Sequence, residues 1–297
     1  MTAFIILRKL ETEENVRMNK QELLELQKNA CKVRINTIEG VFNAKSGHPG
    51  GSLSAADIIT YLYFKEMNVD PKNPKDPARD RFVLSKGHCC PALYGALALK
   101  GYFSEDEIKV LRHIGAMLQG HPDMKHTPGV DMSSGSLGQG VSAACGMALA
   151  AKYDNADYRV YAMLGDGECE EGQVWEAAMF ASHYKLDNLC LIVDFNGLQI
   201  DGTVNEVGGL EPIDSKFEGF GFEVIKIDGN DFEQIEAAFE KAKTVKGKPT
   251  VIIARTIKGK GVSYMENQVG WHGKAPNADE YKVAMDELNA QLKALEA

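Results

Sequence analysis

Short apolar runs alternate along the chain with longer amphipathic stretches. The run Val160–Leu164 breaks at Gly165-Asp166-Gly167, and the run Leu189–Val193 ends at Asp194-Phe195-Asn196-Gly197. Continuous apolar runs of this length are typical of buried strands in parallel sheets. Between them lies a stretch with a single apolar helical face, formed by Val174, Ala177, Ala178 and Ala181. We therefore predict a strand–helix–strand unit with polar oxygen ligands at the carboxyl ends of its strands, the edge at which open α/β sheets bind ligands.

The same patterns predict the remaining elements. Strands are expected at 81–84, 222–227 and 250–254, and helices at 20–45, 54–67, 91–99, 141–151, 231–243 and from 279 onward. A capping box at Ser104–Glu107 is expected to open a further helix. The long loop at 115–137 is rich in glycine, serine and proline, and loops of that length are usually functional or disordered. Strands alternating with helices predict one parallel α/β sheet with helices on both faces. We assign residues 18–297 to this single domain and expect residues 1–17 to be a disordered extension.

The composition of the chain excludes some classes of function. The chain has 297 residues, 44% hydrophobic residues and a net charge of −9, without a Lys/Arg-rich patch, which argues against a nucleic-acid partner. No apolar run is long enough to cross a membrane. The six cysteines include no Cys-x-x-Cys pair, so we expect reduced thiols in a cytoplasmic protein.

The Gly-Asp-Gly turn points to a metal-bridged phosphate. Gly165 and Gly167 allow the backbone to approach a bulky anion closely, whereas Asp166 would repel it unless a divalent cation lay between them. Mg²⁺ takes oxygen ligands and is often held by one or two protein groups together with phosphates. Asp166, the Asn196 amide oxygen and a nearby backbone carbonyl would suffice. The alternative is a strand-end turn whose Asp and Gly residues serve only local geometry.

Four of the seven histidines lie beside glycine in predicted loops, namely His48, His88, His121 and His272. A histidine can donate to a phosphate or a developing alkoxide, and its usual pKa lies near working pH. We interpret His113, placed in a helix, and His183 as structural, and leave His126 undecided.

Together these residues resemble the N-terminal, thiamine diphosphate-binding half of transketolases. The GDG…N cofactor motif, common to many thiamine diphosphate enzymes, falls on Gly165–Gly167 and Asn196. The marks specific to transketolases follow in family order: Ser46–Gly50 (SGHPG), Ser85–His88 (SKGH), Gly120–Pro122 (GHP), Gly135–Gly140 (GSLGQG) and His272–Pro276 (HGKAP). The resemblance covers roughly residues 20–285 and implies the thiamine diphosphate-binding (PP domain) fold.

The resemblance also implies residue roles. Asp166, Asn196 and the Leu198 carbonyl would hold Mg²⁺, or Ca²⁺ or Mn²⁺, against the diphosphate of the cofactor. Catalytic roles in proton transfer at the sugar hydroxyls would fall on His48, His121 and His272. Glu171 and Glu176, which we also count among the catalytic residues, match an acidic pair near the dimer interface of the family, although carboxylates favoured by a helix N-terminus are a nearly equal alternative. The remaining cofactor contacts would come from Gly165, Gly167, His88, His272, Gly135, Ser136 and Leu137, with Ser136 standing where proline is common.

Full-length transketolases are about twice as long as this chain. Their second half supplies the pyrimidine-binding domain, the glutamate that activates the cofactor and most of the groups that bind the sugar phosphate, and no stretch after residue 250 matches it. The resemblance thus implies one subunit of a split transketolase that needs a C-terminal partner subunit, most simply in an α2β2 assembly, and that transfers a two-carbon ketol unit from a ketose phosphate to an aldose acceptor.

Three alternatives remain open. One is another thiamine diphosphate enzyme, similar to 1-deoxyxylulose-5-phosphate synthase or to the α subunit of a 2-oxoacid dehydrogenase. The set His48, His121 and His272 argues against it, because decarboxylation of a 2-oxoacid does not need donors for a polyol. A non-catalytic binding subunit is disfavoured by intact Asp166 and Asn196. A plain nucleotide-binding domain would need a GxGxxG motif after its first strand, and the chain has none there.

Overall fold

Five parallel strands form the central sheet in the order β1-β2-β3-β7-β6. The computed structural model describes residues 18–297, so the expectation for residues 1–17 lies outside the described part. In the register of the sheet Gly165 lies beside Asp194 and Asp194 beside Ala254. The carboxyl ends of the three central strands therefore meet at one edge. The strand bounds are β1 Arg81–Leu84, β2 Val160–Gly165, β3 Leu189–Phe195, β6 Glu223–Asp228 and β7 Thr250–Arg255.

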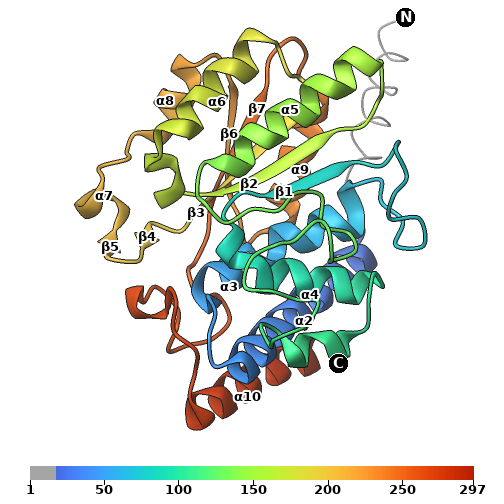
Figure 1. The fold of residues 1–297 in the computed structure, drawn as a ribbon. Coiled ribbons are helices and arrows are strands. Elements are labelled where there is room, and N and C mark those ends of the chain that lie inside the picture. Colours follow the sequence, from blue (N-terminus) through green and yellow to red (C-terminus); the bar gives the residue numbers. More distant parts are fainter. Residues whose placement is uncertain (1–17) are drawn as a thin grey trace, which may run out of the picture.

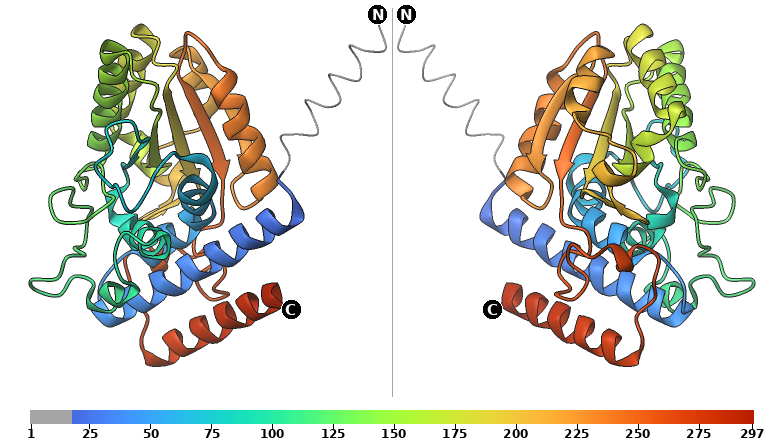
Figure 2. Two further views of the ribbon diagram at one scale, coloured as in Figure 1. Left: turned by 90° about the vertical axis from the view of Figure 1, so that its right-hand side faces the viewer. Right: turned by 90° about the vertical axis from the view of Figure 1, so that its left-hand side faces the viewer.

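Helices cover both faces of this sheet, as predicted (Figure 1). Neighbouring residues of β3 such as Leu191 and Ile192 belong to separate hydrophobic clusters, because successive side chains of a strand point to opposite faces. One cluster packs against α2 (Lys20–Ala44), α3 (Pro49–Tyr61), α4 (Cys90–Lys100) and α9 (Phe232–Thr244), and the other against α5 (Gln139–Asp154), α6 (Gly172–His183) and α8 (Ile213–Gly219). Figure 2 shows α5 and α6 on one side of the sheet and α9 on the other.

The C-terminal helix α10 (Ala278–Glu296) packs on α2, away from the sheet (Figure 2). Its Ala284 and Leu288 are buried in a third, smaller cluster with Trp271, and Tyr281 stacks on Phe42 with ring centroids 3.9 Å apart. A capping box of Asn277 and Glu280 opens the helix. This packing anchors the preceding loop 258–276, which carries His272, against the body of the domain.

The structure corrects several predicted bounds. Helix α3 begins at Pro49 rather than at residue 54, because proline suits the first helical turn, and it continues into a π-helical turn at Leu62–Glu66. Ser104 caps only a short 3-10 helix, Glu105–Val110, by accepting from Asp106 N. The placement of His113 in a helix was wrong, since it lies exposed in the turn that follows.

A compact excursion after β3 was not predicted at all. It contains a small antiparallel hairpin, β4 (Leu198–Gln199) with β5 (Gly202–Thr203), followed by α7 (Val204–Val207) and α8. Two-residue strands and a four-residue helix leave no periodic pattern in a sequence. The hairpin lies directly beyond Asn196 and so borders the predicted metal site.

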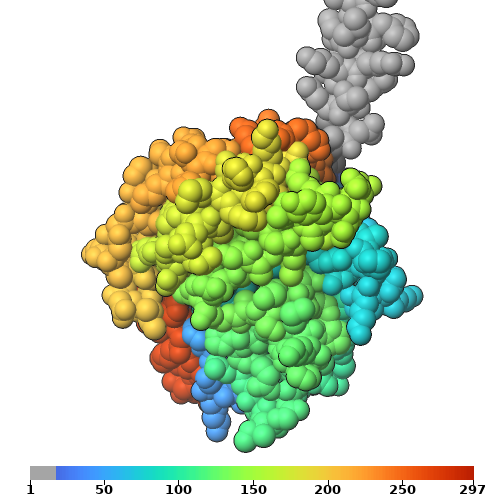
Figure 3. Space-filling view, turned by 45° about the horizontal axis from the view of Figure 1, so that its top comes forward, coloured from blue at the N-terminus to red at the C-terminus, as the bar shows by residue number. Residues whose placement is uncertain are grey.

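In residues 18–297 no helix combines the length and apolar character needed to cross a membrane. The space-filling view in Figure 3 shows the loop 115–137, in green, as a broad part of the exposed surface below α5. This loop reaches the carboxyl edge of the sheet through His121 and Gly135.

Candidate active site

A cavity of about 510 Å³ opens at the carboxyl edge of the sheet. Its walls come from loops that follow strands or precede helices, which is where open α/β sheets place their ligands. The residues that line it include most of the predicted site: His48, His88, His121, His272, Gly135, Leu137, Gly165, Asp166, Gly167, Glu171, Asn196 and Leu198, together with Lys86, Glu168 and Lys258.

Asp166 lies at the floor of this cavity, 3% exposed. Its Oδ1 accepts from Gly167 N at 2.8 Å, and its Oδ2 accepts from Gly197 N at 2.5 Å. The carboxylate therefore joins the turn after β2 to the turn after β3 while one lone pair on each oxygen stays free. Burial, and then the neighbouring Asp194, raise the pKa of Asp166 to about 6. A cation close to Asp166 would favour the ionised form of this carboxylate.

Asp194 is the second, fully buried carboxylate of the site. Its Oδ2 accepts from Lys86 Nζ at 2.5 Å and from Ser54 Oγ at 2.6 Å, and Thr256 Oγ1 donates to its other oxygen. Burial alone would raise the pKa of Asp194, but the Lys86 ammonium and these hydroxyls bring it below its usual value. Burial alone would lower the pKa of Lys86, but the neighbouring Asp194 carboxylate outweighs burial and raises it. The pair is thus ionised at neutral pH.

The same carboxylate orients the Asn196 amide. Asn196 Nδ2 donates to Asp194 Oδ2 at 3.3 Å, while Asn196 Oδ1 accepts from Leu198 N at 3.1 Å. The amide oxygen is thereby turned away from Asp194 and towards the Leu198 backbone. Of its lone pairs, one remains available to a metal ion.

Lys258 reaches into the cavity from the loop after β7. Its Nζ donates to the Leu198 carbonyl at 2.9 Å and lies 3.1 Å from His272 Nδ1. The ammonium has no carboxylate within ion-pair distance in the part of the chain that the structure describes. Burial lowers the pKa of Lys258, and a buried ammonium without a direct partner is a strong site for an anion.

Three histidine rings converge above these charges. The ring centroids are 5.0 Å apart for His48 and His88, 5.5 Å for His48 and His272, and 5.2 Å for His88 and His272. His121 approaches from the loop 115–137 and lies 3.4 Å from the position that a Cβ on Gly135 would take. The ring nitrogen Nδ1 of His48 is buried without a hydrogen-bond partner among the described residues, so the site leaves a polar group for a ligand to satisfy.

All four histidines are neutral at pH 7. Burial is the main cause in each case, and it lowers the pKa of His48 and His88 to about 4 and that of His272 to about 3. Neighbouring positive charge adds to the effect, from Lys86 at His88 and from Lys258 at His272. The pKa of His121 is lowered by burial as well. Neutral imidazoles can each donate one hydrogen bond and accept another.

The donor set fits a diphosphate bound through a divalent cation. The Lys258 ammonium and the neutral histidines provide donors for phosphate oxygens, and Asp166 with the Asn196 and Leu198 oxygens provides ligands for Mg²⁺. Residues 18–297 contain no cluster of three or more His, Cys, Asp or Glu side chains arranged to hold a metal. One carboxylate, one amide and one carbonyl would leave positions around Mg²⁺ for phosphate oxygens.

Some predicted residues lie elsewhere. Ser136 is exposed between the two lining residues Gly135 and Leu137. Glu171 lines the mouth of the cavity, whereas Glu176 lies further along α6, exposed beside a shallow groove between α5 and α6. The other histidines lie outside the cavity: His113 and His183 are exposed, and the exposed His126 pairs with Asp123 at 2.6 Å.

Sequence reasoning missed the buried charges of the site, namely Lys86, Glu168, Asp194 and Lys258. Lys86 lies inside the SKGH box and Asp194 two residues before Asn196, so both were within or beside recognised motifs. These carboxylates and ammonium groups are 0–2% exposed. Charged side chains are rarely buried so completely unless they are paired or functional. Burial of these particular charges was not visible in the pattern of the sequence.

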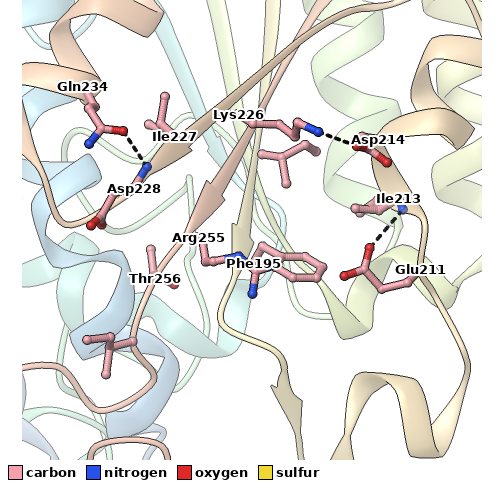
Figure 4. A pocket seen from close by; sticks show the side chains of 12 residues that line it. Phe195, Glu211, Ile213, Asp214, Lys226, Ile227, Asp228, Gln234, Arg255 and Thr256 are labelled. Carbon is pink, nitrogen blue, oxygen red and sulfur yellow. Dashed lines mark hydrogen bonds and ion pairs between the residues drawn. The ribbon is translucent and has the colours of Figure 1, made fainter.

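A second cavity of about 590 Å³ lies further along the same edge, between β6, β7 and α8 (Figure 4). Its polar groups already pair with one another: Lys226 with Asp214 at 2.7 Å, and Gln234 Oε1 with Asp228 N at 3.0 Å. The Arg255 guanidinium lies over the Phe195 ring at 4.9 Å. None of the four site histidines lines this second cavity. The candidate catalytic residues line the cavity of about 510 Å³ instead.

Comparison with known proteins agrees with this geometry. The family model described as "Transketolase, thiamine diphosphate binding domain" matches residues 26–293. The chain is 47% identical to a 6-deoxy-6-sulfo-D-fructose transketolase subunit of Clostridium sp. (strain MSTE9), over 92% of this chain and 99% of that one. It is 45% identical to an apulose-4-phosphate transketolase subunit of Phocaeicola vulgatus, over 93% of this chain and 97% of that one.

Longer relatives match over less than half of their length. Human transketolase is 42% identical over 93% of this chain, which corresponds to 44% of the human protein. The crystal structure of transketolase from Campylobacter jejuni superposes with a TM-score of 0.86 and 36% identity, over 94% of this chain and 46% of that one. The sheet order, the cavity and the motifs around it thus have one common explanation: the chain belongs to the transketolase family and corresponds to its N-terminal, thiamine diphosphate-binding domain.

Proposed function

We propose that this chain is the N-terminal subunit of a two-chain transketolase that transfers a two-carbon ketol unit from a ketose phosphate to an aldose acceptor. The observation that carries the proposal is the cavity in which Asp166, Asn196 and two lysines face a group of neutral histidines. Two relatives of similar length are named as transketolase subunits, which supports a separate partner chain here. The six cysteines are free and buried, which supports a place in the cytoplasm.

In this proposal the floor of the cavity binds the cofactor. Asp166, Asn196 and the Leu198 carbonyl hold Mg²⁺, or Ca²⁺ or Mn²⁺, and Lys258, His88 and His272 donate to the diphosphate. Gly135 and Leu137 line the wall beside the rest of the cofactor. Thiamine diphosphate supplies an electron sink for breaking and forming the carbon–carbon bond. The protein has to hold it, orient it and keep water away.

The histidines act on the sugar. His48, His121 and His272 are neutral, so each can hydrogen-bond to a sugar hydroxyl, and a ring nitrogen with a free lone pair can take up a proton from it. The Nδ1 atom of His48 has no hydrogen-bond partner in residues 18–297. Glu171 is exposed and lines the cavity, which supports a contact with a partner. For Glu176 the exposed position on α6 supports a contact between subunits rather than with substrate.

A C-terminal transketolase subunit would close the cavity from outside and supply the carboxylate that activates the cofactor. The simplest assembly is α2β2 with two-fold symmetry. The test is to assay the chain alone and with a transketolase C-terminal half encoded beside its gene, using Mg²⁺, thiamine diphosphate, a ketose phosphate and an aldose acceptor. We expect turnover only with both chains. Full turnover by this chain alone would contradict the two-chain arrangement.

The relatives also favour a test of the donor sugar. Their names refer to apulose 4-phosphate and to 6-deoxy-6-sulfo-D-fructose, and both sugars carry an anionic group. The assay therefore includes a sulfonated ketose and apulose 4-phosphate beside the common ketose phosphates. Absence of Mg²⁺-dependent cofactor binding, even with the partner, would instead support a non-catalytic binding subunit.

A further inference from the structure

Glu168 is a buried carboxylate that none of the roles above uses. It lies in the 3-10 turn Gly167–Glu170 directly after the Gly-Asp-Gly motif and is 2% exposed. It is one of the residues that line the cavity. A carboxylate is rarely buried this completely unless it is paired or hydrogen-bonded, so its partners indicate what it does.

The partners of Glu168 come from three separate parts of the chain. Its Oε1 accepts from Ser85 Oγ at 2.5 Å and from Gly138 N at 2.9 Å. Its Oε2 accepts from Gly165 N at 3.0 Å. Ser85 follows β1, Gly138 opens α5 and Gly165 ends β2. A single side chain thus joins three of the motifs that surround the cavity.

Each partner is the direct neighbour of a residue that lines the cavity. Ser85 precedes Lys86, Gly138 follows Leu137, and Gly165 precedes Asp166. A shift of the backbone at any of these three positions would move the Lys86 ammonium, the Leu137 side chain or the Asp166 carboxylate. We propose that Glu168 is a positioning residue that fixes Lys86, Leu137 and Asp166 relative to one another before the cofactor binds.

The hydrogen-bond directions suit an ionised carboxylate. Gly138 and Gly165 contribute N–H groups, which can only donate, and Ser85 Oγ accepts from Val141 N at 3.1 Å, so its own proton goes to Glu168. A carboxylate can accept all three. Burial raises the pKa of Glu168, while Ser85 and the two amides work against that rise. Fixed donors around one buried charge form a rigid arrangement, since any displacement leaves a polar group unpaired.

Replacement by glutamine gives a sharp test because it preserves size and shape. Glutamine has one accepting oxygen and one donating NH₂ group, so the NH₂ must face either Gly165 N or the pair Ser85 and Gly138. In both orientations at least one backbone N–H loses its acceptor. We expect Glu168→Gln to bind thiamine diphosphate with Mg²⁺ at least about tenfold more weakly, the usual effect of losing a hydrogen bond to a charged group. We expect Ser85→Ala, which removes one of the three contacts, to weaken binding less.

Glu66→Gln is the matched control. The Glu66 side chain is 2% exposed and lies outside the cavity, where it accepts from Tyr161 Oη at 2.8 Å and Lys243 Nζ at 3.2 Å. Its replacement is expected to lower stability without a change in cofactor affinity. A purely structural role of Glu168 would give the same result, so the two variants separate positioning from stability.

Two measurements test the positioning role of Glu168. This inference rests on the proposed function. Calorimetry with Mg²⁺ and thiamine diphosphate is done on the complex of this chain with its partner. Hydrogen exchange on this chain without cofactor is expected to show faster exchange of Gly138 N or Gly165 N in Glu168→Gln and no change there in Glu66→Gln. If the wild-type complex binds no cofactor, the proposed function fails together with the inference. If the wild type binds and Glu168→Gln binds equally well, the inference alone is overturned.

Discussion

Lys258 Nζ lies 3.1 Å from Nδ1 of His272, and this contact fixes the tautomer of the histidine. An ammonium has only protons to offer, so Nδ1 must accept and Nε2 must carry the ring proton. The pKa of His272 is lowered to about 3, by burial and then by Lys258, so the ring stays neutral and carries its proton on Nε2. Lys258 therefore acts twice, as a cation for an anionic ligand and as the group that orients His272.

Replacement of Lys258 by methionine keeps the length of the side chain and removes both effects. We expect the affinity for thiamine diphosphate with Mg²⁺ to fall by about ten- to a hundredfold, because a hydrogen bond between charged groups is lost. The ¹⁵N shifts of His272 are expected to show the other tautomer or a mixture. Lys260→Met is the control, since Lys260 lies two residues away and only weakly pairs with Glu266 at 4.0 Å. Equal cofactor affinity in the two variants would refute this role of Lys258.

His48 distinguishes ketol transfer from the decarboxylation alternatives. We expect His48→Ala, in the complex with the partner subunit, to lower kcat/KM for ketol transfer by about 10²–10⁴-fold, the usual contribution of an acid–base group. Cofactor affinity is expected to change much less. His113→Ala is the control, because His113 is exposed outside the cavity. If the complex instead decarboxylates a 2-oxoacid, His48→Ala is expected to leave the rate of that reaction nearly unchanged.

Much of the fold was predictable because its signals are local. The strand bounds of β1 and β2 follow from uninterrupted apolar runs, and α9 follows from its regular apolar face. The excursion from Leu198 to Gly219 was not predictable, because its strands and helices are too short for a period to develop. The early start of α3 was missed because Gly50 and Gly51 resemble a helix stop until their close packing against Lys258 and Cys89 is known.

The candidate site, like the fold, was predictable from the sequence only in part. Asp166, Asn196 and the loop histidines can be recognised because they lie in glycine-flanked motifs. Lys258 and Glu168 also lie beside a glycine, but their roles depend on which distant residues they meet: Lys258 meets Leu198, and Glu168 meets Ser85 and Gly138. Contacts between segments so far apart along the chain are set by the packing of the sheet, which a single sequence does not show. Glu176 illustrates the reverse case, since its motif position suggested a site role and the structure places it outside the cavity.

The neutral histidines predict how stability depends on pH. Folding lowers the pKa of His48 from 6.5 to about 4 and that of His88 likewise, so between these values the unfolded chain binds more protons than the folded one. Stability is therefore fully present above pH 6.5 and falls as the pH drops towards 4. Urea unfolding of the apo chain between about pH 7.5 and about pH 4.5 is expected to show this loss. NMR titration of labelled histidine is expected to show His48 still neutral at about pH 6, and a pKa near its ordinary value of about 6.5 would contradict the burial argument.

Asp194 is expected to be the most costly carboxylate to change. In Asp194→Asn the Lys86 ammonium loses its carboxylate partner at 2.5 Å while remaining 2% exposed, and an uncompensated buried charge costs about 3–5 kcal/mol. Asp214→Asn removes the exposed pair with Lys226 at 2.7 Å and is expected to cost less than about 1 kcal/mol. Chemical denaturation measures both differences. Similar losses in the two variants would show that Lys86 is less well enclosed than the structure indicates.

Two glycines of α5 give opposite predictions for the same substitution. A Cβ on Gly140 would lie 2.7 Å from the Ser85 Cα atom, and a backbone atom cannot move aside cheaply, whereas a Cβ on Gly146 meets nothing within 4 Å. In a helix interior alanine is favoured over glycine by about 1 kcal/mol, so Gly146→Ala is expected to stabilise the chain by up to about that amount. Gly140→Ala is expected to destabilise it by about 1–3 kcal/mol through overpacking.

The substitution at Gly140 also has a local consequence. Ser85 Oγ donates to Glu168 and accepts from Val141 N, so pushing α5 away from Ser85 disturbs the wall that carries Lys86 and Leu137. We therefore expect Gly140→Ala to weaken cofactor binding as well as stability, and Gly146→Ala to leave cofactor binding unchanged. Urea denaturation of this chain and calorimetry with Mg²⁺ and thiamine diphosphate on the two-chain complex test both parts. A stable Gly140→Ala variant with wild-type cofactor affinity would show that α5 can move without disturbing the cavity.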